Sequence, residues 1–185
     1  MVKRVDEPDA RPDTSAWPPS RQAPRGVHAP KRGLALLGEF STCFALLDEA
    51  AEILRDHPQV SHSHVPVYLH HYDFDTLTEQ GAICRRMAGR ADMAMAILEA
   101  QIGKLPDAAT RDRGHLTAKL AVTVTQDSNA DLGRAALLGH EALDIAHQTG
   151  SARIRRELEE LDRELAARWP DTNETHTFHE AMHAA

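Results

Sequence analysis

The spacing of apolar residues is the feature that most constrains the fold of this chain. From residue 34 onward alanine and leucine dominate, and apolar residues recur every three or four positions rather than every second position. That period places them on one face of an α-helix, whereas a half-buried strand requires alternation. No segment of the sequence alternates over more than a few residues, so we predict an all-α fold.

Proline, glycine and capping residues divide this region into six predicted helices. Pro58 and Pro106 mark helix ends, because a proline disfavours helical conformation in the residue before it. Gly89 and Gly150 stand where a left-handed C-terminal cap is needed, and Ser151 is a suitable N-cap. The predicted helices cover residues 34–55, 70–88, 91–104, 107–126, 130–148 and 151–169.

The two ends of the sequence differ from this helical region. Residues 1–33 hold six of the ten prolines and carry seven Lys or Arg against four acidic residues. Such a composition buries too little apolar surface to fold, so we predict a disordered proline-rich arm over 1–33. The helical-repeat domain is predicted over 34–169, and residues 170–185 are predicted to form a polar, histidine-containing tail.

Length and charge exclude several classes of function. A chain of 185 residues fits one globular domain with a tail. The net charge of −7 argues against a general nucleic-acid surface, which is usually basic. The sequence contains neither an apolar run of membrane-spanning length nor the apolar core of a secretory signal. We therefore expect a cytoplasmic protein that does not contact a membrane.

Small residues at regular intervals suggest how the helices pair. Gly81, Gly89 and Ala94, followed by Pro106, are similar to the 34-residue tetratricopeptide repeat. In such repeats small side chains let the two helices of a hairpin approach, and the proline ends the second helix before the next repeat. The expected architecture is therefore a set of antiparallel helix hairpins stacked as a short tetratricopeptide-like α-solenoid.

Three segments carry a resemblance to a known family. They read EQGAICRRMAGRADMAMAILEAQIGKLP, RDRGHLTAKLAVTVTQ and GHEALDIAHQTGSARIRRELEELDREL. Over residues 70–168 the chain resembles the C-terminal tetratricopeptide-like region of actinobacterial Xre-type transcriptional regulators. Those regulators carry an N-terminal helix-turn-helix that binds DNA, and residues 1–33 are too few for one. The resemblance implies a sensing or docking region, without direct DNA binding by this chain.

Two arginines belong to the candidate binding site. In a repeat register placed on Gly81, the first helix lines a concave groove with Asp75, Thr78, Arg85 and Arg86. Guanidinium groups match carboxylate geometry, so Arg85 and Arg86 would clamp an acidic peptide. The alternative is that both cations are solvated at a helix C-terminus and stabilised by its dipole.

Histidines form two further groups. Residues 179–183 read His-Glu-Ala-Met-His and fit H-E-x-x-H, in which two histidines bind zinc and the glutamate acts as base. Only two residues follow His183, so the usual downstream third ligand is missing and we predict no metal site. A second group suits zinc, nickel or copper by residue type, but its spacing matches no defined site. It comprises His57, His62, His64, His70 and His71, with Asp73 and Asp75 nearby.

These observations predict a non-enzymatic helical-repeat protein that binds a protein or peptide, without a cofactor, in the setting of transcriptional regulation. One alternative is a truncated regulator remnant without activity of its own. Another is a metal-dependent hydrolase that uses residues 179–183. The apolar stripe with Phe40 and Phe44 is more typical of a core than of a recognition surface. It begins the helical region abruptly, so partial exposure of it would favour a homodimer or docking of a partner.

Overall fold

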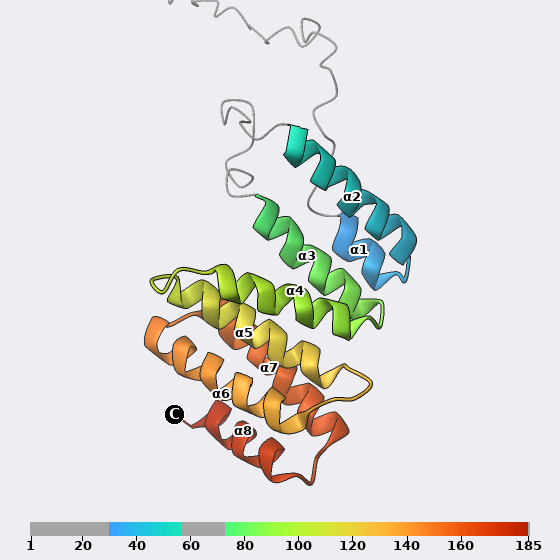
Figure 1. The fold of residues 1–185 in the computed structure, drawn as a ribbon. Coiled ribbons are helices and arrows are strands. Elements are labelled where there is room, and N and C mark those ends of the chain that lie inside the picture. Colours follow the sequence, from blue (N-terminus) through green and yellow to red (C-terminus); the bar gives the residue numbers. More distant parts are fainter. Residues whose placement is uncertain (1–29, 57–72, 185) are drawn as a thin grey trace, which may run out of the picture.

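The computed structural model describes residues 30–56 and 73–184 of the chain. Within those ranges every regular element is an α-helix and no strand occurs, which confirms the predicted all-α class (Figure 1). The eight helices of the described residues are α1 (Pro30–Leu36), α2 (Phe40–Asp56), α3 (Phe74–Met87), α4 (Ala91–Lys104), α5 (Thr110–Thr125), α6 (Leu132–Thr149), α7 (Ala152–Arg168) and α8 (Asn173–His183).

The caps anticipated from the sequence define several of these boundaries. Gly150 ends α6 with a left-handed φ of 62°, a conformation that glycine adopts without steric penalty. Ser151 then begins α7, and its side chain accepts a hydrogen bond from the backbone N–H of Ile154. Asp73 and Asp131 cap α3 and α6 in the same way. Local sequence therefore determines where these helices start and stop.

The first predicted helix, over 34–55, is two helices in the structure. The chain breaks between α1 and α2 at Gly38, which has a φ of 77°. The apolar stripe continues through this turn, so its periodicity alone does not reveal the break. Helix α1 also begins at Pro30, inside the segment predicted as a disordered arm. The remainder of that arm, residues 1–29, lies outside the described residues.

The predicted tail over 170–185 is also different in the structure. Helix α8 packs against α6 and α7 instead of fraying. Thr175, Phe178 and Met182 follow one another at spacings of three and four, and all three are buried. Phe178 is completely inaccessible to solvent. The polar residues between them make this apolar face difficult to recognise in the sequence. Because α8 is packed on α6 and α7, the helical domain extends to His183.

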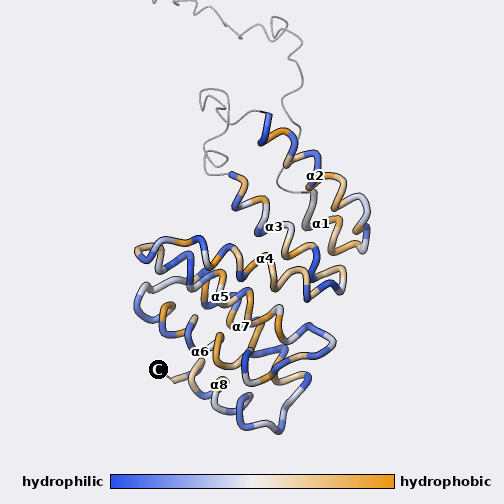
Figure 2. The backbone as a smooth tube through the Cα atoms, viewed as in Figure 1, coloured by the Kyte–Doolittle hydropathy of each residue, from blue (hydrophilic) through white to orange (hydrophobic). Residues whose placement is uncertain are grey.

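The helices are arranged broadly in chain order, except that α7 lies beside α5 (Figure 1). In Figure 1 the stack runs from α1 and α2 at one end to α8 at the other. From α3 onward each helix packs against the next one in the chain, and α5 also contacts α7 while α6 contacts α8. Helix α5 is the central element, since every residue from 114 to 125 is buried. In Figure 2 hydrophobic and hydrophilic residues alternate along the helices around α5.

The hydrophobic core consists of three clusters that follow the stack. One joins α1, α2 and α3, the next joins α3 to α6, and the third joins α5 to α8. Burying apolar surface in this way is the main favourable term in folding. None of the helices in the described part of the chain has the length and hydrophobicity needed to cross a bilayer.

Two glycines allow the closest helix contacts. A Cβ at Gly114 of α5 would lie 2.5 Å from Ile145 of α6, and one at Gly139 of α6 would lie 2.6 Å from Leu161 of α7. From the sequence we expected Gly81 to have this role. A Cβ there would meet only the guanidinium end of Arg85, at 3.0 Å. Close packing thus depends on the later glycines, in the part of the stack around α5 and α6.

Candidate functional site

Charged side chains from α3, α5 and α7 meet between these three helices. Helices α3, α5 and α7 each place charged or imidazole residues at helical spacing on the side that faces the other two. Most of these side chains are largely buried, so their charges interact with one another more strongly than they would in water. They are Glu79 and Arg86 of α3, His115 and Lys119 of α5, and Arg153, Glu157 and Glu160 of α7.

Glu79 connects all three helices. Its Oε1 accepts a hydrogen bond from the ammonium of Lys119, a side chain that is only 7% exposed. The guanidinium of Arg153 lies 3.4 Å from the same oxygen. The Nδ1 atom of His115 lies 3.8 Å from it. One carboxylate of α3 therefore faces two cations and an imidazole on α5 and α7.

Glu157 lies on the other side of His115. Its Oε1 is 3.6 Å from Nε2 of the imidazole. Burial opposes the charged form of this carboxyl, but the hydrogen bond with His115 and the positive charges of Lys119, His115 and Arg86 outweigh it. Together they lower the pKa of Glu157 below its ordinary value. Glu157 is therefore a carboxylate at neutral pH.

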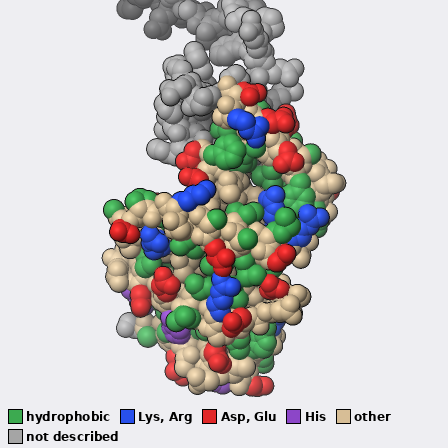
Figure 3. Space-filling view, in the orientation of Figure 1, with side chains coloured by type: hydrophobic (Ala, Val, Ile, Leu, Met, Phe, Trp, Pro, Cys, Tyr) green, Lys and Arg blue, Asp and Glu red, His purple; other side chains and the backbone are tan. Residues whose placement is uncertain are grey.

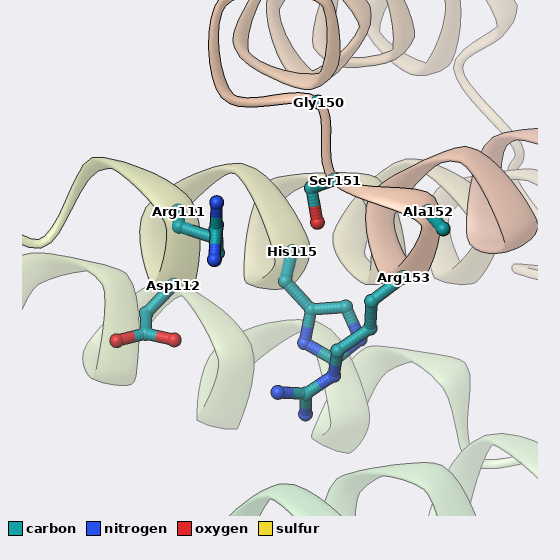
Figure 4. Close-up of a pocket in the computed structure, with 7 residues that line it drawn as sticks. All are labelled: Arg111, Asp112, His115, Gly150, Ser151, Ala152 and Arg153. Carbon is teal, nitrogen blue, oxygen red and sulfur yellow. The ribbon is translucent and has the colours of Figure 1, made fainter.

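Beside this cluster is a cleft of about 290 Å³. It is lined by Arg111, Asp112 and His115 of α5 and by residues 150–153, where α6 passes into α7. In Figure 4 the hydroxyl of Ser151 points toward α5, with Arg111 and Asp112 to one side of His115 and Arg153 to the other. His115 is only 3% exposed and links the cleft to the charged cluster beneath it.

The cleft favours an anionic group. Its lining contains Arg111 and Arg153 against a single acid, Asp112, although one nitrogen of the Arg153 guanidinium also lies 3.4 Å from Glu79 beside the cleft. The N-terminus of α7 also opens here, and the unpaired backbone N–H groups of a first helical turn attract negative charge. Arg111 is oriented by a hydrogen bond from its Nη2 to the carbonyl of Thr149, 3.0 Å away. Over the face seen in Figure 3, by contrast, acidic and basic side chains are mixed.

The four residues predicted to bind a peptide do not share one surface. Arg86 donates to Glu160 of α7 at 3.0 Å, and its side chain is 9% exposed. Arg85 instead lies over the ring of Phe44 in α2, at 5.5 Å from the centroid. The two guanidinium groups therefore face different neighbouring helices. Peptide binding by Arg85 and Arg86 stays a prediction.

The other two predicted residues lie nearer the start of α3. The hydroxyl of Thr78 donates to the carbonyl of Phe74, 2.6 Å away and in the same helix. Asp75 is exposed in the first turn, and its carbonyl oxygen accepts a hydrogen bond from Gln101 of α4. Neither side chain lines the cleft.

Apart from Arg86, the residues of the cleft and of the charged cluster were not predicted from the sequence. One signal for them was available: polar residues repeat every fourth position on the buried helix α5, at His115, Lys119 and Thr123. On α7 the same interval separates Arg153 from Glu157. Buried polar residues with this spacing indicate a network between helices, because a buried polar group requires a partner.

The structure describes only one of the two histidine groups noted in the sequence. The histidines from His57 to His71 lie outside the described residues, so the expectation that they form no defined metal site stays a prediction. His179 and His183 lie on α8 and face Asp162 of α7. They do not take part in the cleft.

No protein-family model, curated protein or solved structure matches this chain. The functional proposals therefore rest on its own residues and their geometry.

Proposed function

We propose that this chain is a non-enzymatic helical-repeat protein that binds a peptide or a partner protein through the cleft between α5 and the α6–α7 junction. The observation that carries the proposal is the cationic lining of this cleft, with two arginines against one aspartate, in a chain with a net charge of −7. The group that fits is an acidic side chain or a C-terminal carboxylate of the partner, because arginine forks bind carboxylates bidentately.

The order of helix contacts supports a tetratricopeptide-like stack. Pairing α3 with α4, α5 with α6 and α7 with α8 gives three consecutive hairpins. In such a stack each hairpin contacts the next through equivalent helices, and the second and third hairpins do so through α5 with α7 and α6 with α8, while the first hairpin packs on the second through α4 and α5. In this arrangement α3, α5 and α7 are the first helices of the three hairpins, and each contributes side chains to the charged cluster.

The surroundings of His115 favour binding over catalysis. Both of its ring nitrogens face carboxylates, Glu79 on one side and Glu157 on the other. A general base needs a ring nitrogen directed at the proton that it removes. Here the imidazole serves instead to join the α3 and α7 carboxylates beneath the cleft. The proposed link with transcriptional regulation comes from the sequence resemblance alone.

The proposal is tested by binding of short acidic peptides to the purified chain. Fluorescence polarisation compares peptides that carry a free C-terminal carboxylate or Asp and Glu side chains with amidated versions that carry Asn and Gln. The wild-type chain should prefer the charged peptides. Arg111→Ala combined with Arg153→Ala should weaken their binding by about 10- to 100-fold, which corresponds to loss of charge-assisted hydrogen bonds.

The matched control is Arg155→Ala combined with Arg156→Ala. Both arginines are exposed on α7, and neither lines the cleft. This variant has the same net charge as the cleft variant, so a general electrostatic effect would weaken binding equally in both. Binding that is lost only in a variant of Arg85 would place the peptide on the α3 surface predicted from the sequence. Equal binding of charged and neutral peptides by the wild type would contradict the proposal.

A further inference from the structure

Three potential metal ligands converge where α8 packs against α7. His179 and His183 are four residues apart and so lie on the same face of α8. Asp162 of α7 faces them. Nδ1 of His179 lies 3.1 Å from each carboxylate oxygen of Asp162, and Nε2 of His183 lies 3.7 Å from Oδ2.

These distances suit a single bound ion. Each residue offers one ligand atom, and the three atoms lie within 4.8 Å of one another. Zinc binds imidazole nitrogen and carboxylate oxygen at about 2.0–2.2 Å, so neighbouring ligand atoms of a tetrahedral site are about 3.3 Å apart. The separations of 3.1 and 3.7 Å fall on either side of that value. Both histidine side chains are exposed and can rotate toward that spacing around Asp162.

The backbone beneath the three ligands is fixed, while the ligands themselves are accessible. Phe178 and Met182, which alternate with the two histidines on α8, are buried in the core. The side chains of His179 and His183 are 56% and 63% exposed, and that of Asp162 is 14% exposed. An ion can therefore enter from solvent and keep water in its remaining coordination position.

We propose that Asp162, His179 and His183 bind one divalent transition-metal ion of the zinc type, which joins α8 to α7. Two imidazoles and one carboxylate favour zinc and its neighbours over magnesium or calcium, which prefer oxygen ligands alone. From the sequence we expected no site, because no third ligand follows His183. The fold supplies that ligand from Asp162, which precedes His179 by 17 residues.

The test is zinc binding by the full chain, purified without a histidine tag and stripped of metal with a chelator. Isothermal titration and elemental analysis should give one more bound zinc ion per chain in the wild type than in Asp162→Asn, His179→Gln or His183→Gln. The affinity of that site should fall at least about tenfold in each variant. Zinc, but not magnesium, should raise the thermal midpoint of the wild type, because an ion that binds the folded state stabilises it.

The matched control is His176→Gln, which removes an exposed histidine of α8 that is not part of the cluster. It should retain the wild-type number of bound ions. The histidines between residues 57 and 71 could bind zinc as well. The test therefore compares the number of zinc ions bound by the wild type and by each variant, and does not rely on the total number bound by the wild type. Far-UV circular dichroism of each variant verifies that α8 remains folded. Wild-type affinity in Asp162→Asn, or an equal loss in His176→Gln, would show that zinc binds elsewhere and overturn the proposal.

Discussion

Replacing Gly139 with alanine tests whether close helix packing at α6 holds the stack together. The new Cβ would lie 2.6 Å from Cδ2 of Leu161 in α7 and 2.7 Å from Cε2 of Phe178 in α8. Carbon atoms pack best at about 3.5–4.0 Å, so both neighbours would have to move by about 1 Å. Leu161 and Phe178 are completely buried, so neither can move without displacing other core residues.

Two opposing contributions set the size of the effect. Overpacking of a well-packed core typically costs about 1–3 kcal/mol. Alanine is favoured over glycine inside a helix by up to about 1 kcal/mol, which offsets part of that cost. We therefore expect Gly139→Ala to lower the free energy of unfolding by about 1–2 kcal/mol. For a chain of this size that corresponds to a thermal midpoint about 2–8 °C lower.

The assay is guanidinium denaturation followed by far-UV circular dichroism, with Gly133→Ala as the matched control. Gly133 lies in the same helix, and a Cβ there would meet only Asp131, at an ordinary 3.6 Å. The control should be as stable as wild type or up to about 1 kcal/mol more stable, because alanine is favoured over glycine in a helix and no side chain is displaced. If Gly139→Ala proved as stable as Gly133→Ala, α6 would not approach α7 and α8 as closely as described, and the packing argument would be refuted.

Two further substitutions test the charged cluster and the last helix. The pKa of Glu157 is lowered in the folded state. Its negative charge therefore stabilises the fold at pH values above the ordinary glutamate pKa of about 4.3. This stabilisation is lost as the pH falls through the lower pKa of the folded state. Glu157→Gln should therefore reduce stability by about 1 kcal/mol at neutral pH, and this deficit should shrink as the pH falls below about 4.3. A deficit that stays constant with pH in denaturant titrations would contradict the charge assignment. Phe178→Ala should lower the free energy of unfolding by about 3–5 kcal/mol, since the ring is fully buried and also meets His140 edge-on at 5.4 Å. A loss below about 1 kcal/mol in the same titration would mean that α8 is not part of the core.

The secondary structure was largely readable from the sequence, because its causes are local. The 91–104 helix was predicted with the bounds that the structure gives it, and Gly150 and Ser151 end one helix and begin the next as expected. Two elements were missed for equally local reasons. The apolar stripe runs through Gly38 without interruption, and the buried face of α8 consists of only three residues among polar ones.

The candidate sites could not be predicted in the same way, because each combines residues from different helices. The sequence places Arg85 beside Arg86, yet the fold pairs Arg86 with Glu160, 74 residues away. Arg111 and Arg153 share a cleft because α5 packs against α7. Asp162 reaches His179 because α8 folds back onto α7.

Local sequence is sufficient to show that this chain is helical, where most of its helices begin and end, and which residues carry charge or can ligate a metal. Those properties depend on backbone preferences and side-chain chemistry within a few residues. The packing of the helices settles which charges neutralise one another, which of them line a cleft, and which potential metal ligands lie within 4.8 Å of one another. Such pairings depend on the angle and the distance between packed helices. Contacts between core side chains that are far apart in the sequence determine that angle and that distance.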